Sequence, residues 1–139
     1  MGLTDDLATC HALRRVVFIE EQGVPEDLEV DGRDAEALHL LARRKGRAVG
    51  AARLLVNGDT VKIGRVCVLA DQRGLGVGVA LIAAALDVAR GLPGVRRAKL
   101  GSQTHAIGFY EKLGFVAEGP EYLDAGILHR DMVHGLNGA

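Results

Sequence analysis

The chain has few of the residues that mark several classes of protein. Its 139 residues include no Trp, 2 Tyr and 3 Phe, and 17 basic against 18 acidic residues leave a formal net charge of −1. Nucleic-acid-binding proteins need a basic surface and often use aromatic rings for base stacking. We therefore expect no nucleic acid among its partners.

Cysteine and long apolar runs are scarce as well. The two cysteines, Cys10 and Cys67, are far apart and lack C-x-x-C spacing, which suggests a reduced protein. No apolar run approaches the roughly 20 residues that cross a bilayer. Residues 1–6 lack the basic-then-apolar pattern of a signal peptide. We expect a cytoplasmic protein that makes no membrane contact and needs neither a disulfide nor a metal.

Length and apolar periodicity predict one mixed α/β domain over residues 1–139. The predicted helices cover residues 5–20, 75–90 and 104–113. The predicted strands cover residues 37–42, 48–56, 61–69, 97–100, 115–117 and 127–133. In the second helix we expect one buried stripe made by Leu75, Val79, Ile82, Leu86 and Ala89. Residues 20–34 are predicted as an acidic loop, which either attracts a cationic substrate or is simply solvated.

The third predicted strand changes phase in its middle. Val61 and Ile63 share one parity, whereas Val66 and Val68 have the other, with Gly64 and Arg65 between them. A β-bulge inserts one residue and redirects the side chains that follow it. Burial of the strand on both faces would also explain the pattern.

A glycine-rich turn follows that strand and opens the second helix. Gly74, Gly76 and Gly78 lie where free backbone N–H groups and the helix dipole favour an anion. Arg73 adds a cation beside the turn. No Lys or hydroxyl residue follows as in a Walker loop, and the spacing is not that of a dinucleotide fingerprint. Close packing of the helix on the sheet is the alternative explanation for the glycines.

Two blocks of sequence resemble the GNAT family of N-acetyltransferases. Residues 73–78 (RGLGVG) match its R-x-x-G-x-G signature, and residues 106–115 (AIGFYEKLGF) match its A-x-x-F-Y-x-x-x-G-F block. Residues 18–25 and 122–129 resemble a subgroup of small, stand-alone bacterial members. The resemblance covers about residues 13–133. It implies the GNAT fold: a mixed, mostly antiparallel sheet flanked by helices on both faces and splayed at a β-bulge.

The resemblance also implies that acetyl-CoA is the co-substrate. The pantetheine arm is expected along the backbone of the strand before the turn, and the diphosphate on the amides of the turn. Gln103 stands where the family often has Asn. The implied contacts with the coenzyme are Val66, Cys67, Val68, Arg73, Gly74, Leu75, Gly76, Val77, Gly78, Val79, Gln103 and Tyr110.

Direct attack of a primary amine on acetyl-CoA in a ternary complex is the implied reaction, with a small molecule or a peptide as acceptor. Tyr110 matches a tyrosine near the coenzyme sulfur and is expected to be the general acid; a core aromatic is the alternative. A general base is also needed, because a free alkylamine is mostly charged at pH 7. The candidates for the base are Glu29, Asp31, His39 and His129, of which Asp31 and His129 are also expected to bind the acceptor.

Arg65 and Cys67 have further possible roles. Arg65, at the expected bulge, either binds an acceptor carboxylate or pairs with the acidic loop. Cys67 on an apolar strand is expected to pack rather than to act as a nucleophile. The competing functions are a non-catalytic acyl-CoA-binding or sensing module and a nucleotide-binding regulatory domain.

The start of the chain departs from the family pattern, which begins with a strand. At most Gly2 and Leu3 precede the first predicted helix. An uncovered sheet edge at this point would favour a homodimer.

Overall fold

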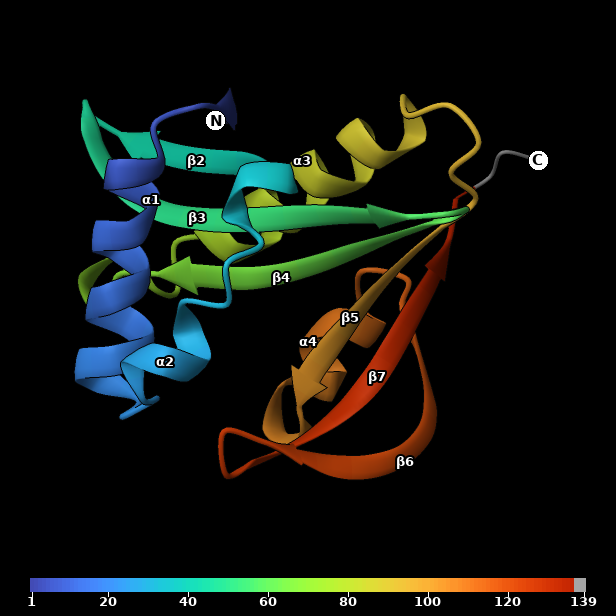
Figure 1. The fold of residues 1–139 in the computed structure, drawn as a ribbon. Coiled ribbons are helices and arrows are strands. Elements are labelled where there is room, and N and C mark those ends of the chain that lie inside the picture. Colours follow the sequence, from blue (N-terminus) through green and yellow to red (C-terminus); the bar gives the residue numbers. More distant parts are fainter. Residues whose placement is uncertain (137–139) are drawn as a thin grey trace.

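A seven-stranded sheet in the order β1-β2-β3-β4-β5-β7-β6 organises the chain (Figure 1). This computed structural model describes residues 1–136. All neighbouring strands run antiparallel except β4 and β5, which are parallel. The strands are β1 (Gly2–Thr4), β2 (Leu38–Arg44), β3 (Arg47–Asn57), β4 (Thr60–Val68), β5 (Arg97–Gln103), β6 (Val116–Asp124) and β7 (Ile127–Gly135).

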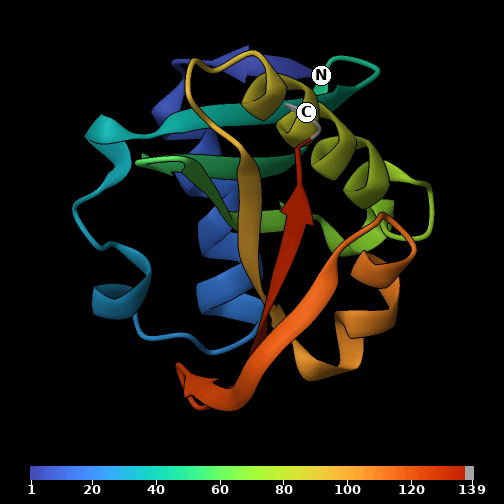
Figure 2. The same cartoon turned by 90° about the vertical axis from the view of Figure 1, so that its right-hand side faces the viewer.

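Helices cover both faces of this sheet. They are α1 (Leu7–Arg14), which continues as a π-helix (Arg15–Glu21), α2 (Glu26–Glu29), α3 (Val77–Arg90) and α4 (Ile107–Glu111). Single 3₁₀ turns cover Asp34–Glu36, Ala70–Gln72 and Thr104–Ala106. Figure 2 shows α1 on one side of the sheet and α3 with α4 on the other. The predicted mixed α/β architecture is confirmed.

The strands form two hydrophobic cores because their side chains alternate between faces. On β2, Leu40 and Ala42 join the larger core under α3, whereas Leu41 joins the smaller core under α1. The core face of α3 consists of Leu81, Ile82, Ala85, Leu86 and Ala89. Each face of the sheet therefore has its own hydrophobic core beneath the helices that cover it.

The predicted buried stripe of the second helix was wrong at two of its five residues, Leu75 and Val79. Leu75 lies before α3 and is 52% exposed, and Val79 in its first turn is 43% exposed. The helix begins only at Val77 because Gly74 and Gly76 adopt φ of +80° and +82°, which interrupts a helix. The first helix begins at Leu7, where the Asp6 side chain accepts a hydrogen bond from the Thr9 N–H at 3.1 Å.

The β-bulge is confirmed. Ala51 pairs with Cys67 and Arg53 pairs with Gly64, so β4 carries one more residue than β3 across this interval. Arg65 lies at the bulge with φ of +51°, which is unusual for a residue other than glycine. As a result, the residues before and after the bulge, Val61, Ile63, Val66 and Val68, all pack against the same core despite their opposite parity.

A short first strand is present. Gly2, Leu3 and Thr4 pair with Leu41, Leu40 and His39 of β2. The sheet therefore begins with a three-residue edge strand. Association through this edge stays a prediction.

Candidate active site

A cleft between β4 and β5 holds a cavity that brings together several of the predicted site residues. The two strands pair only where Thr60–Lys62 meet Arg97–Lys99 and diverge beyond Lys62 (Figure 1). A cavity of about 340 Å³ opens where they part. Its walls include Arg65 and Val66 from β4, Gln103 from β5, Tyr110 from α4 and His129 from β7.

The edge of β4 that faces this cleft offers free backbone groups. The Leu69 N–H donates to the Val49 carbonyl of β3 at 2.9 Å. Because backbone groups alternate in direction along a strand, those of Cys67 also face β3, while those of Val66 and Val68 face the cleft. The Val68 carbonyl accepts a hydrogen bond from Arg73 at 3.0 Å, so the N–H and carbonyl of Val66 and the N–H of Val68 are the groups that can pair with an extended ligand.

Cys67 points away from the cleft. Its side chain is 3% exposed and packs with Cys10 and Leu13 in the smaller core. Burial raises the pKa of Cys67 to about 12, so the thiol stays protonated. The structure therefore brings Val66, but not the Cys67 side chain, to the cavity, and a buried thiol of this kind is a poor nucleophile.

The glycine-rich turn presents free N–H groups to solvent. The helix-capping position of α3 is Gly76, which has no side-chain cap, and the first helical bond runs from Ala80 N–H to Gly76. The N–H groups of Val77, Gly78 and Val79 thus lack an intrahelical acceptor. A Cβ at Gly74 or Gly76 would meet nothing within 4 Å, so the turn is open to an approaching group. A diphosphate fits this donor set.

Two residues hold the turn in place. The Arg73 guanidinium donates to the Val68 carbonyl at 3.0 Å and to Glu21 at 2.9 Å, so Arg73 joins the turn to the first helix rather than standing free. Gly50 of β3 lets α3 approach the sheet, since a Cβ there would lie 2.9 Å from the Cys67 carbonyl and 3.0 Å from Leu81. Sequence analysis missed Gly50; glycine within a strand is the signal that it offered.

Tyr110 and Gln103 lie on the wall of the cavity opposite β4. The Tyr110 ring packs edge-on against Phe109 and Phe115, with centroid distances of 5.0 and 5.9 Å. Burial raises the pKa of Tyr110, so its phenol is protonated at neutral pH. The Gln103 amide lies 3.4 Å from Gln22 and 2.8 Å from His105.

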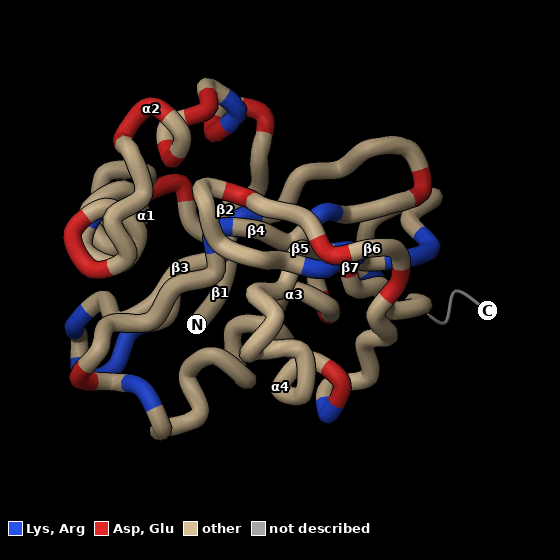
Figure 3. Tube along the Cα trace, turned by 90° about the horizontal axis from the view of Figure 1, so that it is seen from below, with Lys and Arg blue, Asp and Glu red and all other residues tan. Residues whose placement is uncertain are grey.

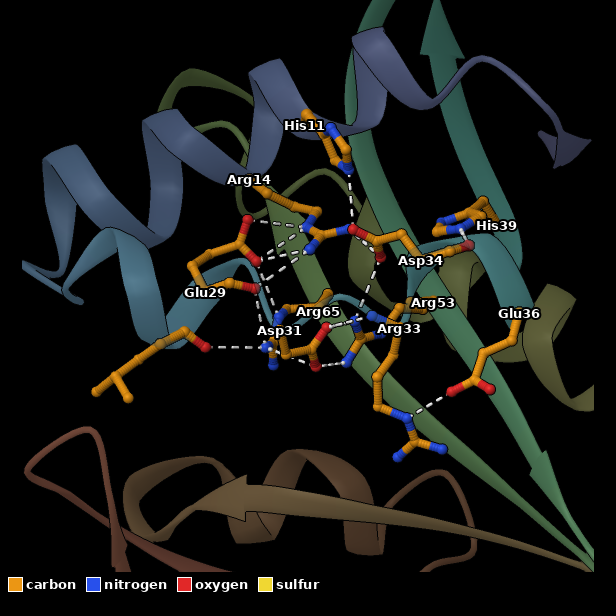
Figure 4. Close-up of polar contacts among 11 residues, drawn as sticks. His11, Arg14, Glu29, Asp31, Arg33, Asp34, Glu36, His39, Arg53 and Arg65 are labelled. Atoms are coloured by element: carbon orange, nitrogen blue, oxygen red, sulfur yellow. Dashed lines mark hydrogen bonds and ion pairs between the residues drawn. The ribbon is translucent and has the colours of Figure 1, made fainter.

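The acids of the loop beside the cavity form a network of ion pairs with arginine guanidiniums (Figure 4). The two buried guanidiniums, Arg14 and Arg53, are 1% and 6% exposed. The pairs are Arg14–Glu29 at 2.6 Å, Arg14–Asp34 at 2.8 Å, Arg53–Asp31 at 2.8 Å, Arg53–Asp34 at 3.2 Å, Arg65–Glu29 at 2.9 Å and Arg65–Asp31 at 3.3 Å. Three acids therefore face three guanidiniums, and the loop is not a free acidic patch.

The comparisons with known proteins agree with this geometry. The model of the acetyltransferase (GNAT) domain family matches residues 8–136. The chain belongs to this family. It is 36% identical over 130 residues to the uncharacterized N-acetyltransferase YjcF of Bacillus subtilis, which covers 93% of this chain and 92% of that protein.

Solved GNAT structures share the fold. An acyl-CoA N-acyltransferase from Pseudomonas aeruginosa is 36% identical, with a TM-score of 0.83 over 93% of this chain and 90% of that one. An aminoglycoside 6'-N-acetyltransferase solved with coenzyme A is 14% identical, with a TM-score of 0.79 over 99% and 97%, and shows the fold alone. The protein is thus a GNAT acyltransferase, and acyl-CoA is the acyl donor of the reaction.

The histidines expected in this GNAT site occupy different places. His129 lines the cavity, and its Nδ1 lies 2.7 Å from the Ile127 carbonyl. His39 is 5% exposed on β2, contacts the Asp34 carbonyl at 2.9 Å, and is not among the residues that line the cavity. The structure therefore brings His129, but not His39, to the cleft.

Glu29, Asp31 and Arg65 are held together at the edge of the GNAT cleft. Glu29 and Arg65 line the cavity, whereas Asp31 contacts Arg65 at 3.3 Å and is not among the lining residues. The Glu29 carboxylate already accepts hydrogen bonds from two guanidiniums. A hydrogen bond from Arg53 holds the pKa of Asp31 well below its usual value. Of the two roles expected for Arg65, the structure shows pairing with the acidic loop.

Sequence analysis missed a support for His129. The Tyr122 ring stacks on His129 with centroids 6.0 Å apart, and its hydroxyl donates to Asp131 at 2.6 Å. Gly101 permits this contact, because a Cβ there would lie 2.5 Å from the Tyr122 oxygen. The sequence alone does not show that Gly101 and the Tyr122 side chain lie this close, because they belong to different strands.

No helix within residues 1–136 is long and apolar enough to cross a membrane. Over the same residues, no group of three or more His, Cys, Asp and Glu side chains has the arrangement of a metal site.

Proposed function

We propose that this GNAT protein transfers an acetyl group from acetyl-CoA to the primary amine of a small molecule or peptide by direct attack in a ternary complex. The observation that carries the proposal is the divergence of β4 from β5, because β4 then runs with an open edge from the cavity at Arg65 and Val66 to the glycine turn after Val68. An extended arm on that edge leads from an anion site at the turn to the polar residues of the cavity.

The binding of the donor follows from backbone groups. The N–H groups of residues 74–79 and the dipole of α3 hold the diphosphate. Val66 and Val68 pair with the pantetheine arm, as a strand would. Leu75 and Phe109, which are 52% and 40% exposed, offer apolar contacts beside the turn. Acetyl-CoA supplies the activated carbonyl, and the Val66 N–H is placed to polarise it.

His129 is the proposed acceptor of the amine proton. A carbonyl only accepts hydrogen bonds, so the contact with Ile127 requires the hydrogen on Nδ1. The neutral ring then keeps its lone pair on Nε2. Glu29 and Asp31 remain possible acceptor contacts, but their oxygens are occupied by Arg14, Arg53 and Arg65. Of the expected base candidates that line the cavity, His129 is thus the one whose side chain is not held by a guanidinium.

Tyr110 is the proposed acid. As the carbon–nitrogen bond forms and the carbon–sulfur bond breaks, Tyr110 gives its proton to the departing sulfur, and His129 holds the proton taken from the amine. The raised pKa of Tyr110 means that the resulting phenolate regains a proton readily from water. Each residue is then restored for the next turnover.

Release of coenzyme A from acetyl-CoA, measured against a panel of primary amines, tests this function. We expect release that depends on the amine and is lowered by His129→Gln. Saturable binding of acetyl-CoA without amine-dependent release would favour a binding module instead. Thermal shift with coenzyme A, ATP and NAD provides a second check, because a ligand at 100 times its Kd stabilises by about 2.7 kcal/mol. Preference for ATP or NAD would contradict the proposal.

A further inference from the structure

A second hollow of about 440 Å³ adjoins the active-site cavity. The two share Lys62 and Leu100, so they form one continuous groove along β4 and β5. The polar residues of this second hollow are mostly charged: Arg33, Asp59, Lys62, Arg97, Lys99 and Asp131, with Asn57 and Thr60 beside them. Four of these side chains are cationic and two are acidic.

Lys62 and Lys99 are the central pair of this basic hollow. They are register partners on the neighbouring strands β4 and β5. Val61 and Ala98, their neighbours in sequence, point into the larger core, so both lysines project from the opposite face of the sheet. Like charges placed opposite each other on adjacent strands repel. A ligand anion between the two ammonium groups would relieve this repulsion.

The nearby acids offset only part of this charge. Lys99 lies 3.4 Å from Asp131, whose other oxygen is taken by Tyr122. Lys62 forms no ion pair with any residue in the described part of the chain. The Arg33 guanidinium contacts Glu36 at 2.6 Å and is 53% exposed at the rim. Arg97 contacts only the Thr60 hydroxyl, at 2.9 Å, so Lys62 and Arg97 are the cations with capacity for a ligand.

The acidic region beside the groove does not cancel the field of these lysines. Figure 3 shows red segments around α2 and blue segments on β4 and β5. The carboxylates next to the cavity, Glu29, Asp31 and Asp34, are already paired with buried guanidiniums. Asp59 in the hollow and Asp124 in the cavity also form no ion pair among the described residues, so the local excess of positive charge lies where Lys62 and Lys99 are opposite each other.

We propose that the acceptor carries an anionic group, a carboxylate or a phosphate, that binds between Lys62 and Lys99 while its amine lies near His129. This inference rests on the proposed function. His129 pairs with Gln103, four residues along β5 from Lys99, which corresponds to roughly 13 Å of strand. The anion of the coenzyme is assigned to the opposite end of β4, after Val68, so the basic hollow remains free for the acceptor.

A titration with non-acceptor anions tests the hollow without requiring turnover. The full chain is titrated with glutarate and, separately, with inorganic phosphate, and the backbone and side-chain NMR signals of Lys62 and Lys99 are followed. We expect saturable shifts at both lysines and binding about tenfold weaker in Lys62→Met, as for loss of one charged contact. Lys45→Met, in the turn between β2 and β3, is the matched control and should bind like the parent.

Kinetics with matched amines then link the hollow to the acceptor. The rates with 6-aminohexanoate and an aminoalkyl phosphate are compared with those for hexylamine and 1,6-diaminohexane. We expect anionic amines to have the higher kcat/KM, and Lys62→Met to raise their KM with little change in kcat. The kcat/KM for hexylamine should be the same in Lys62→Met and its parent. A carboxylate preferred over a phosphate, or the reverse, identifies which anion the acceptor carries.

The results separate failure of this inference from failure of the proposed function. Unsaturable shifts, or equal anion binding by Lys62→Met and its parent, would overturn the anionic acceptor even if amines are acetylated. Faster acetylation of the neutral or cationic amine would do the same. Saturable anion binding that depends on Lys62, in a protein that acetylates no amine, would contradict the proposed function and leave an anion site of another purpose.

Discussion

Nη2 of Arg14 lies 2.6 Å from Oε2 of Glu29, and the two side chains are 1% and 4% exposed. This pair joins α1 to α2 across the edge of the cleft, and Arg65 at the bulge contacts the same carboxylate. The ionic network thereby connects Arg65 on the wall of the cavity to α1 and α2.

Removal of Arg14 should destabilise the protein strongly. Arg14→Met leaves Glu29 and Asp34 buried with one cation fewer, and breaking a buried pair in this way costs about 3–5 kcal/mol. Chemical denaturation measures the free energy of unfolding. Asp87→Asn, which breaks an exposed pair with Arg90, should change it by less than about 1 kcal/mol. Similar effects of the two substitutions would show that the network is not a structural support.

Stability should fall in acid because of Asp31. A hydrogen bond from Arg53 lowers its pKa from 3.8, so near that pH the unfolded chain binds more protons than the folded one. The stabilisation is present above about pH 4 and is lost as the pH falls further. Denaturation between pH 6 and 2 should show this loss, and Asp31→Asn should have a shallower pH dependence over that interval. A parallel dependence in the two proteins would contradict the assignment.

Features with a local backbone cause were predictable from the sequence. The phase change around Gly64 and Arg65 correctly indicated the bulge, because side-chain alternation records an inserted residue. The spacing of Gly74 and Gly76 likewise indicated a turn that needs positive φ. The same glycines, however, delay the start of α3, and apolar periodicity alone misassigned Leu75 and Val79 to its core face.

Features that join distant parts of the chain were not predictable. The ionic network depends on Arg14 and Arg53 reaching acids that lie 15 or more residues away, and charge pattern alone showed only an acidic loop. The pairing of Lys62 with Lys99 depends on the register of a short parallel ladder. Sequence patterns report which face a residue occupies, but not which residue of another strand lies beside it.

Tyr110→Phe should lower turnover more than coenzyme affinity. The substitution removes only the hydroxyl, so the ring still packs against Phe109 and Phe115. General acid catalysis contributes about 10²–10⁴-fold, and we expect a loss of kcat toward the lower end of that range. Steady-state kinetics and the Kd for acetyl-CoA give the two quantities. Unchanged kcat in this variant would remove Tyr110 from the mechanism.

Gly76→Ala should weaken coenzyme binding beyond its effect on stability. Gly76 has φ of +82°, and a residue with Cβ in the left-handed region costs roughly 1–2 kcal/mol. Gly94→Ala is the matched control, because Gly94 has φ of +74° beyond the other end of α3. Both variants should lose similar stability, but only Gly76→Ala should raise the Kd for acetyl-CoA. Equal Kd values in the two variants would show that the turn is structural.

A crystal structure with coenzyme A bound tests the central claim most directly. We predict the diphosphate within hydrogen-bond distance of the N–H groups of residues 76–79, and the pantetheine arm paired with Val66 and Val68 in the cleft between β4 and β5. Coenzyme A bound elsewhere, with the turn after Leu69 and the edge of β4 making no contact with it, would contradict the account.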